Sequence, residues 1–549
     1  MQLEAIVTQI LTDQAIRVRN KVDEPLSINI FNTTNEKEQS TNEINGQFVY
    51  SQLLIDCLLR MPSTSTDKDE LIDLCKKQYK DNATELAIIV EFERDYSSNR
   101  ALWWYTRESF LYRLLNKALR VHNIDLLFLF RFFIRDLRRQ LEQLQCQTAI
   151  HVYRGQVMSN DEFQSLKNSI GQFITMNSFL STSLDRRLAL SFLTSSTASD
   201  DLQRVLFEIE IDPTLPSIKP CANITSHSFF TDEQEVLIML GSIFRLKSIN
   251  HHDRVWIIQM TLCSDDDDAL KPIFDYMKKE YNEGDDRLSL FSFGVLLFRM
   301  GQYDRAEKYS HRLLKELPND DEDRPNCYHN LAMIENHKGN YDLSLQWFNK
   351  ALEIYAKLLK PNDPTLAVTY NSIGEVYLRK GDRKSALESF NKALSIRKQA
   401  FGEDNLQVAM CYHNMGNVYQ EEKRFNEAFE CHQKALAIRQ KHLPADHTDL
   451  GASQNCIGSI YLCLGHLDLA LQYYSMALKI YQKSLPADHP NVAMSYYNLG
   501  LIYDFKGNFK ESLTNFQKAS AIFHKTLPST HPHIALVDQD IQRVSNKLR

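Results

Sequence analysis

The chain has 549 residues, which is too long for a single hydrophobic core and predicts several domains. Its formal net charge of -7, with 24% charged residues, gives no basis for nucleic acid as the main partner. The ten cysteines form no CxxC pair, so they favour reduced thiols over a disulfide framework or a zinc site.

Residues 1–96 are predicted to be a mostly helical region of undefined role. The N-terminus lacks the basic start and continuous apolar stretch of a secretory signal. The most apolar segment of the chain, residues 126–134, is shorter than the ~20 residues of a membrane span and contains Arg131. It therefore predicts a buried helix, and together these features predict a cytoplasmic protein without a membrane partner.

Residues 97–262 predict a mixed α+β domain, because two helical segments are followed by short strands without crossover helices between them. Three polar motifs accompany these strands in a fixed order. Arg154 and Gly155 come at the end of an apolar strand. The other two motifs are Ser181, Thr182 and Ser183 after a second strand, and Glu233 and Glu235 before a third.

The order Arg, then Ser-Thr-Ser, then Glu-x-Glu resembles the signature of arginine-specific mono-ADP-ribosyltransferases, a class shared by clostridial toxins and vertebrate ecto-enzymes. Residues 103–120 are also similar to the helix that precedes the first catalytic strand of that family. The resemblance implies the ADP-ribosyltransferase fold and NAD as cosubstrate, and NADP is named with it as the related dinucleotide. It also implies that no metal ion takes part and that the partner is a protein substrate bearing arginine.

The resemblance assigns a role to each motif. Breaking the nicotinamide bond of NAD passes through an oxocarbenium-like sugar cation, which Glu235 would stabilise while bonding the ribose 2'-hydroxyl. Arg154 would hold the pyrophosphate, and Gly155 would let backbone groups reach the nicotinamide amide. Ser181 would orient the ring and the ribose. The residues assigned to NAD binding are Arg154, Gly155, Ser181, Thr182 and Ser183.

Glu233 is assigned to the acceptor. A guanidinium is protonated at physiological pH and attacks poorly unless a carboxylate pairs with it and takes a proton. Family members that modify other residues usually carry glutamine here, so Glu233 predicts transfer to arginine. The preceding loop resembles the one that presents an aromatic side chain to the acceptor, here Phe229 or Phe230. A second Glu-x-Glu, at residues 208 and 210, alternates with apolar residues and predicts a solvated sheet face instead.

Residues 263–285 predict an acidic linker. Four successive aspartates, residues 265–268, repel one another and are poor helix formers. A calcium site is less compatible with this segment, because the spaced oxygen ligands and turn glycine of an EF-hand are missing.

Residues 286–549 are built from repeats. Copies begin at Gly339, Gly381, Lys423, Gly465 and Gly507, each 42 residues after the last, and a divergent copy begins at Gly301. Every copy places Ala or Ser five residues later, at a predicted helix-packing position. The copies resemble the tetratricopeptide repeats of kinesin light chains, which implies an all-α superhelix with a concave groove that binds peptide segments.

Asparagine is common at equivalent first-helix positions of these repeats. Its amide can both donate and accept, so in the resembled family it can hold a peptide backbone. The alternative is that these amides bond only within the helix stack. The residues assigned to the groove are Asn330, Asn371, Asn414, Asn455 and Asn498.

The sequence therefore predicts a multidomain enzyme that transfers ADP-ribose from NAD to arginine and releases nicotinamide, with targets recruited by the repeats. Recruitment would raise the local concentration of the target. Two alternatives are an NAD glycohydrolase, in which water is the acceptor, and a catalytically dead interaction scaffold. The intact Arg154, Ser181, Glu233 and Glu235 favour the enzyme over the scaffold.

Overall fold

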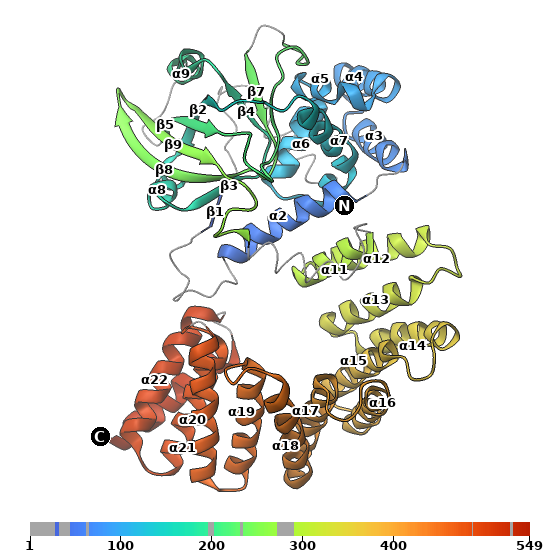
Figure 1. Cartoon of the computed structure of the whole chain (residues 1–549), viewed down its shortest axis with the longest axis vertical. Helices are drawn as coiled ribbons and strands as arrows, with labels where there is room; N and C mark the ends of the chain where they lie inside the picture. The colour runs from blue at the N-terminus through green and yellow to red at the C-terminus, as the bar shows by residue number, and fades with distance from the viewer. Residues whose placement is uncertain are drawn as a thin grey trace. The chain divides into compact units, whose positions relative to one another are not determined.

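The computed structural model describes residues 28–31, 44–61, 65–195, 202–230, 234–271, 290–485, 487–527 and 531–548. The chain forms two compact units, one ending at Phe293 and the other beginning at Gly294 (Figure 1). The first combines helices with one sheet, and the described part of the second consists of helices. This confirms the predicted fold class. The domain boundaries predicted after residues 96, 262 and 285 remain predictions.

Helices in the N-terminal part of the first unit pack around one long helix. α7 (Ile124–Gln143) contacts α2 (Ile44–Arg60), α3 (Ser65–Gln78), α5 (Ala101–Thr106), α6 (Phe110–Arg120) and the short η1 (Ser98–Arg100), while α4 (Ala83–Asp95) contacts α3 and α6. The predicted buried segment 126–134 lies within α7. Its Arg131 is paired with the fully buried Asp67, which neutralises the cation. No helix in the described part of the chain is long and apolar enough to cross a membrane.

The sheet contains nine described strands in the order β1-β3-β8-β9-β5-β2-β4-β7-β6. Only β5 and β9 run parallel among these neighbours. The strands are β1 (Ile28–Phe31), β2 (Ile150–Ser159), β3 (Phe173–Met176), β4 (Leu180–Ser183), β5 (Leu202–Ile211), β6 (Cys221–Asn223), β7 (Glu235–Ile238), β8 (Ile243–His252) and β9 (Val255–Leu262). Helix α8 (Asn160–Lys167) follows β2, and α9 (Arg186–Ser195) follows β4.

Strand alternation gives the sheet two covered faces around β5. Phe207 and Ile209 join the main core of the unit, whereas Leu206, which points the other way, packs with Ala189 and Leu193 of α9. Helix α9 therefore lies over β2 and β5 on one face. This fixes the position of β2, which carries the first of the three motifs.

The acidic segment that we predicted to be a solvated linker is ordered at its start. Asp265 pairs with Lys219 and Asp267 pairs with Arg245, each at 3.2 Å between nitrogen and oxygen. These basic partners offset the repulsion between neighbouring carboxylates, which the sequence alone did not reveal. The remainder of the predicted linker, residues 272–285, lies outside the described residues.

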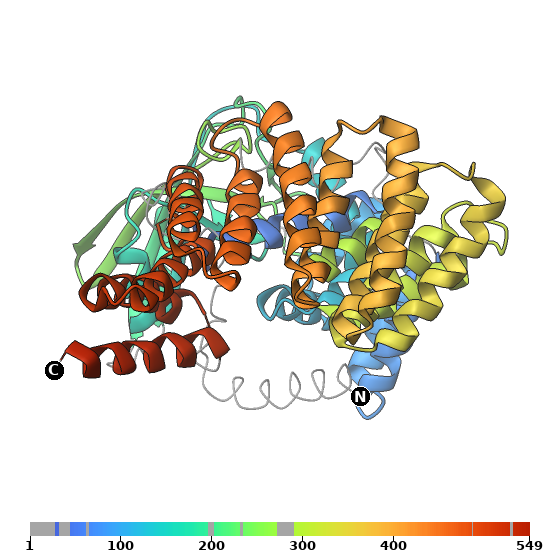
Figure 2. The same cartoon turned by 90° about the horizontal axis from the view of Figure 1, so that it is seen from below.

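The helices of the second unit stack as successive pairs (Figure 2). Helix α11 (Leu290–Arg299) crosses the division between the units. The helices that follow are α12 (Tyr303–Glu316), α13 (Arg324–Lys338), α14 (Tyr341–Leu358), α15 (Pro364–Lys380), α16 (Arg383–Phe401), α17 (Leu406–Glu421), α18 (Phe425–His442), α19 (Thr448–Cys463), α20 (Leu467–Ser484), α21 (Pro490–Phe505), α22 (Phe509–Thr526) and α23 (Pro532–Leu548).

Small residues set the spacing within each pair. A Cβ on Gly500 of α21 would lie 2.7 Å from the Phe516 ring of α22, so glycine at this position lets the two helices approach closely. The turn between α15 and α16 has Gly381 at φ 86°, and the equivalent turn without glycine holds Lys423 at φ 59°. The small residues predicted at the packing position are all fully buried: Ala306, Ser344, Ala386, Ala428, Ala470 and Ser512.

A partly buried histidine makes the stability of the array depend on pH. Burial lowers the pKa of His329 from 6.5 to about 4. Its ring packs against Phe348 at a centroid distance of 5.0 Å, and its Nδ1 lies 3.4 Å from Thr369 Oγ1. The unfolded chain therefore binds a proton between about pH 6.5 and 4 that the folded chain does not bind. Stability falls as the pH falls through this window.

The variant His329→Asn tests this effect, because Asn371 and Asn455 occupy the equivalent positions of other repeats. We expect the opening free energy of α13 and α14 to fall between pH 7 and pH 5 by on the order of 1–2 kcal/mol more in the wild type than in the variant. Hydrogen exchange followed by mass spectrometry, corrected for the intrinsic rate at each pH, measures the difference. The same pH dependence in both proteins would contradict the assignment.

Candidate active site

Three neighbouring strands bring the three motifs together. In the sheet, β4 lies between β2 and β7, with Tyr153 opposite Ser183 and Ser183 opposite Glu235. Arg154, Ser181 and Glu235 line the same pocket, which has a volume of about 200 Å³. The sequence-predicted residues Gly155, Thr182 and Ser183 also line it.

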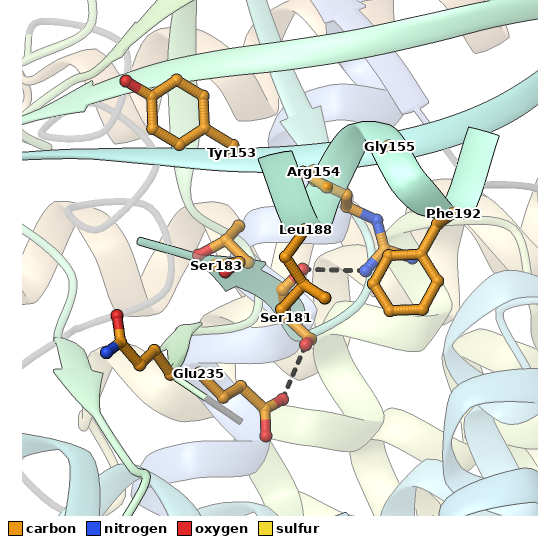
Figure 3. A pocket seen from close by; sticks show the side chains of 11 residues that line it. Tyr153, Arg154, Gly155, Ser181, Ser183, Leu188, Phe192 and Glu235 are labelled. Atoms are coloured by element: carbon orange, nitrogen blue, oxygen red, sulfur yellow. Dashed lines mark hydrogen bonds between the residues drawn. The ribbon is translucent and has the colours of Figure 1, made fainter. Parts of the chain in front are cut away.

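Ser181 connects two charged residues of the pocket, Arg154 and Glu235 (Figure 3). Its hydroxyl donates to Glu235 Oε1 at 2.6 Å, and its backbone carbonyl accepts from Arg154 Nη1 at 2.8 Å. Gln156 Oε1 accepts from Arg154 Nε at 3.3 Å and from Nη2 at 3.1 Å. A carboxylate and a guanidinium are thus held on either side of one serine, with the orientation of each side chain fixed by hydrogen bonds.

The two residues after Ser181 are bonded to the protein itself. Thr182 is buried and its hydroxyl donates to the carbonyl oxygen of Val236 at 2.7 Å, which ties β4 to β7. The Ser183 hydroxyl accepts from the backbone N–H of Asp185 at 3.0 Å, at the turn into α9. In this arrangement both side chains hold β4 in place at the pocket wall.

Gly155 is a point of close contact between strand and helix. A Cβ there would lie 2.2 Å from the Ala189 carbonyl oxygen and 3.0 Å from Leu193 Cγ. Helix α9 also supplies Leu188 and Phe192 to the pocket lining (Figure 3). Because glycine has no side chain, α9 can approach β2 closely at this position.

We expect Gly155→Ala to lower kcat/KM for NAD by at least ~10-fold, because α9 must shift and move Leu188 and Phe192 with it. The measurement is nicotinamide release as a function of NAD concentration, with circular dichroism to confirm folding. Gly171→Ala is the control: a Cβ there meets nothing within 4 Å, and the residue does not line the pocket, although its φ of 87° adds backbone strain. An unchanged kcat/KM for Gly155→Ala would contradict this account.

The predicted acceptor residues are described in part. Glu233 lies outside the described residues, two positions before Glu235. Phe229 and Phe230 are each 42% exposed, and their ring centroids lie 5.2 Å apart. The backbone N–H of Phe229 donates to Thr106 Oγ1 at 2.8 Å, and its ring packs against Trp103 at 5.4 Å. The loop is thus anchored on α5 while both aromatic rings remain accessible.

The second Glu-x-Glu lies elsewhere on the sheet. On β5, Glu208 accepts from Arg186 Nε at 2.8 Å and Glu210 accepts from Lys247 Nζ at 2.7 Å. Neither glutamate lines the pocket. The Glu210 side chain is 48% exposed, which agrees with the predicted solvated face.

Sequence reasoning missed a tyrosine close to the site. Tyr105 of α5 is 3% exposed and donates to Asn116 Oδ1 at 3.2 Å. Burial, and then the neighbouring Tyr112, raises the pKa of Tyr105, with smaller opposing contributions from Glu235 and Arg154. The phenol is therefore neutral, and it lies within electrostatic range of Glu235 and Arg154 without lining the pocket. It lies inside the segment that resembles the family helix, but no pattern distinguished it from the other aromatic residues there.

Phe192 was also missed, because a lone aromatic residue before a polar loop indicates packing. Its side chain is 53% exposed and forms part of the pocket lining. An exposed aromatic ring at the edge of a pocket offers a flat apolar surface to a ligand.

The asparagines predicted to line the repeat groove bond within the stack. Asn414 Nδ2 donates to Asn371 Oδ1 at 3.0 Å, and Asn498 Nδ2 donates to Asn455 Oδ1 at 3.1 Å. Asn330 Nδ2 donates to a serine hydroxyl of α12 at 3.1 Å. These bonds connect neighbouring repeats, so a peptide would have to share the amides. Peptide binding by these residues stays a prediction.

Comparison with known families agrees with both resemblances. Residues 63–268 match the family model described as NAD:arginine ADP-ribosyltransferase, and residues 323–399, 374–441 and 449–525 match tetratricopeptide repeats. Residues 63–268 thus form an ADP-ribosyltransferase domain that uses NAD, and a tetratricopeptide-repeat array for interaction follows it. None of the curated proteins matches the chain.

Solved structures similar to this chain match at low identity. BtubC (BKLC) from P. vanneervenii is 22% identical, covering 42% of this chain and 92% of that chain, with a TM-score of 0.36. A putative kinesin light chain of Podosopora anserina with nearly identical repeats is 23% identical, covering 38% of this chain and 98% of that chain, with a TM-score of 0.33. MamA is 22% identical, covering 36% of this chain and 95% of that chain, with a TM-score of 0.27.

Proposed function

We propose that this chain, which joins an ADP-ribosyltransferase domain to a tetratricopeptide-repeat array, transfers ADP-ribose from NAD to arginine side chains of a target protein. The bond between nicotinamide and the ribose C1' breaks, and a bond between C1' and a guanidine nitrogen forms. The observation that carries the proposal is the Ser181–Glu235 hydrogen bond of 2.6 Å in a pocket that also contains Arg154.

Glu235 is proposed to stabilise the positive charge that develops on the ribose. A carboxylate held in place before the reaction stabilises the transition state without having to reorient. The hydroxyl of Ser181 fixes this carboxylate from one side, and Glu235 can accept the ribose 2'-hydroxyl as well. Ser181 then acts by positioning Glu235 in addition to orienting the nicotinamide end of NAD.

Arg154 is proposed to hold the pyrophosphate of NAD. A guanidinium matches phosphate oxygens through paired N–H donors. The bonds from Arg154 to the Ser181 carbonyl and to Gln156 orient its plane before NAD arrives. Gly155 lets α9 pack closely on β2 and so places the α9 side chains that line the pocket, while Thr182 and Ser183 maintain the geometry of β4.

Glu233 is proposed to select arginine as the acceptor. It would pair with the incoming guanidinium and take one proton as the new bond to C1' forms. The exposed Phe229 and Phe230 precede it in the sequence and would stack on the planar guanidinium. Two carboxylates then have separate tasks, with Glu235 serving the sugar and Glu233 serving the acceptor.

The repeat array is proposed to recruit the target through peptide segments. Tethering a target beside the catalytic domain raises its effective concentration, often into the millimolar range (~mM) with short flexible connections. This supplies selectivity to a site that itself recognises only a guanidinium. All ten cysteines are free thiols, which fits a reducing compartment, and we place the protein in the cytoplasm.

A set of peptides that differ in one residue tests the proposal. Each peptide carries arginine, lysine, asparagine or cysteine at the same position, and is incubated with the full chain and NAD. Mass spectrometry then measures the fraction of peptide that gains ADP-ribose. We expect modification of the arginine peptide alone. Modification of another residue overturns arginine specificity, and nicotinamide release without any modified peptide favours NAD hydrolysis.

A further inference from the structure

Three side chains that can bind metal lie together in the repeat array. They come from three successive helices, His413 from α17, His432 from α18 and Cys456 from α19. Their ligand atoms lie within 4.8 Å of one another. The group belongs to the second unit and shares no residue with the pocket of the catalytic domain.

His432 is the residue that packing alone does not explain. The equivalent positions of other repeats hold Phe348, Phe390, Tyr474 and Phe516. His432 is fully buried, yet neither of its ring nitrogens has a hydrogen-bond partner. An imidazole buried in this way loses the hydrogen bonds of water, whereas phenylalanine at the same position loses none. A ligand on one nitrogen would remove part of this cost.

The local backbone makes room for the imidazole. A Cβ on Gly416 would lie 2.7 Å from the His432 Nε2 atom, so glycine allows the ring to reach α17. The rings of His432 and His413 meet edge to face, with centroids 5.3 Å apart. His413 Nδ1 also has no hydrogen-bond partner. Two adjacent imidazoles thus each present a nitrogen that makes no hydrogen bond.

Cys456 completes the group from the next repeat. Other repeats place Asn330, Ser372, Asn414 or Asn498 at this position. The cysteine therefore replaces these residues in the repeat where two histidines lie beside it. Its Sγ lies 3.9 Å from Asn417 Oδ1. The thiol donates to this amide oxygen, which lies at the edge of the same group.

The protonation states suit a cation. Burial lowers the pKa of His413 to about 4 and that of His432 to about 3, so both imidazoles are neutral and keep a lone pair at pH 7. Burial raises the pKa of the Cys456 thiol to about 11, while Arg439 acts to lower it. Arg439 opposes a bare divalent cation, but the thiolate that forms on metal binding offsets this repulsion.

We propose that His413, His432 and Cys456 bind one zinc ion, with water as the fourth ligand. Two imidazole nitrogens and one thiolate are ligands that zinc accepts in sites that keep one open position. Cys456 loses its thiol proton to solvent as the zinc–sulfur bond forms. A tetrahedral ion with bonds of ~2.0–2.3 Å needs ligand atoms ~3.3–3.7 Å apart, so modest side-chain rotations close the group.

The site connects one repeat to the next. His413 and His432 belong to the α17–α18 pair, whereas Cys456 belongs to the α19–α20 pair. A zinc ion that binds the folded array and not the unfolded chain stabilises this junction. The predicted consequence is a rise in the Tm of the array when zinc is added. The sequence had predicted no metal for this protein, and this inference replaces that expectation for the array.

The test uses the full chain, free of affinity tags and stripped of metal by a chelator. Zinc is titrated in competition with a chromophoric chelator, and cobalt(II) is then substituted to detect sulfur-to-metal charge transfer in the absorption spectrum. We expect one ion per chain. His432→Phe installs the residue of the equivalent repeats and should fold normally, with at least ~100-fold weaker zinc binding and no charge-transfer band.

His329→Asn is the matched control, because it removes a partly buried histidine from another repeat. It should keep zinc affinity and the cobalt spectrum. Wild-type protein that takes up no zinc overturns the proposal, and so does equal zinc affinity in His432→Phe. Uptake of copper(I) without zinc overturns the assignment of the metal. Retention of zinc with loss of the charge-transfer band in Cys456→Ser, which keeps both histidines, supports the thiolate as a ligand.

Discussion

Replacing Glu235 by glutamine is expected to lower both ADP-ribose transfer and NAD hydrolysis by ~100- to 1,000-fold. Glutamine keeps the size of the side chain and can still accept the Ser181 hydroxyl, which now donates to Glu235 at 2.6 Å. The variant therefore removes mainly the negative charge under the ribose, a contribution on the order of 3–4 kcal/mol to transition-state stabilisation. Nicotinamide release and labelling of a guanidine compound are measured in parallel.

Glu210→Gln provides the control for this loss of a carboxylate. Glu210 lies on β5, pairs with Lys247 and does not line the pocket. Both activities should stay within about twofold of the wild type, because the residue neither contacts the pocket nor holds its walls. If Glu235→Gln retained either activity at the wild-type rate, the assigned role of Glu235 would be wrong.

Glu233→Gln is expected to separate the two activities. Without a carboxylate to take its proton, a guanidinium should attack ~100-fold or more slowly, since general base catalysis contributes ~10²–10⁴-fold. Hydrolysis should persist, because water needs no pairing with Glu233 and Glu235 is intact. The measurement is the ratio of ADP-ribose transferred to nicotinamide released.

The control for this variant is its KM for NAD, measured without an acceptor. The KM for NAD should stay close to that of the wild type, because Glu233 serves the acceptor and not the dinucleotide. Equal losses of transfer and hydrolysis would contradict the separate tasks of the two glutamates.

Much of the site was predictable because strand alternation and motif order constrain it. We expected Arg154 at the end of a strand and Ser181 after one, but both lie within strands, β2 and β4, because each strand continues through its polar motif. Glu235 begins β7 as expected, and adjacent pairing of β2, β4 and β7 brings the three residues together. The pairing itself could not be predicted, because nothing local to Ser183 specifies that it lies opposite both Tyr153 and Glu235. The family resemblance supplied what strand patterns could not.

Features that depend on contacts between distant segments escaped prediction. The proximity of Tyr105 to the pocket follows from the packing of α5, and a hydrophobic pattern describes only its burial. The aspartates after residue 264 looked like a repelling run because their partners, Lys219 and Arg245, are distant in sequence. The charge of a residue can be read from the sequence, but the charges of its neighbours in the folded protein cannot.

The candidate zinc ligands also escaped prediction, because they are distant from one another in the sequence. Their spacing, from 413 to 432 to 456, matches no short metal-binding pattern, and each residue alone resembles a variation within a repeat. The repeat alignment did contain a signal, namely histidine at a position where other copies have phenylalanine or tyrosine. Only the stacking of three helices shows that these variations coincide.

The most direct test of the central claim is transfer of labelled ADP-ribose from NAD to agmatine by the full chain. Nicotinamide release is followed in the same reaction, with Glu235→Gln and Glu233→Gln beside the wild type. We predict labelled agmatine with the wild type, almost none with either variant, and continued nicotinamide release with Glu233→Gln. Nicotinamide release by the wild type without any labelled agmatine would contradict an arginine acceptor, and the absence of both products would contradict catalysis.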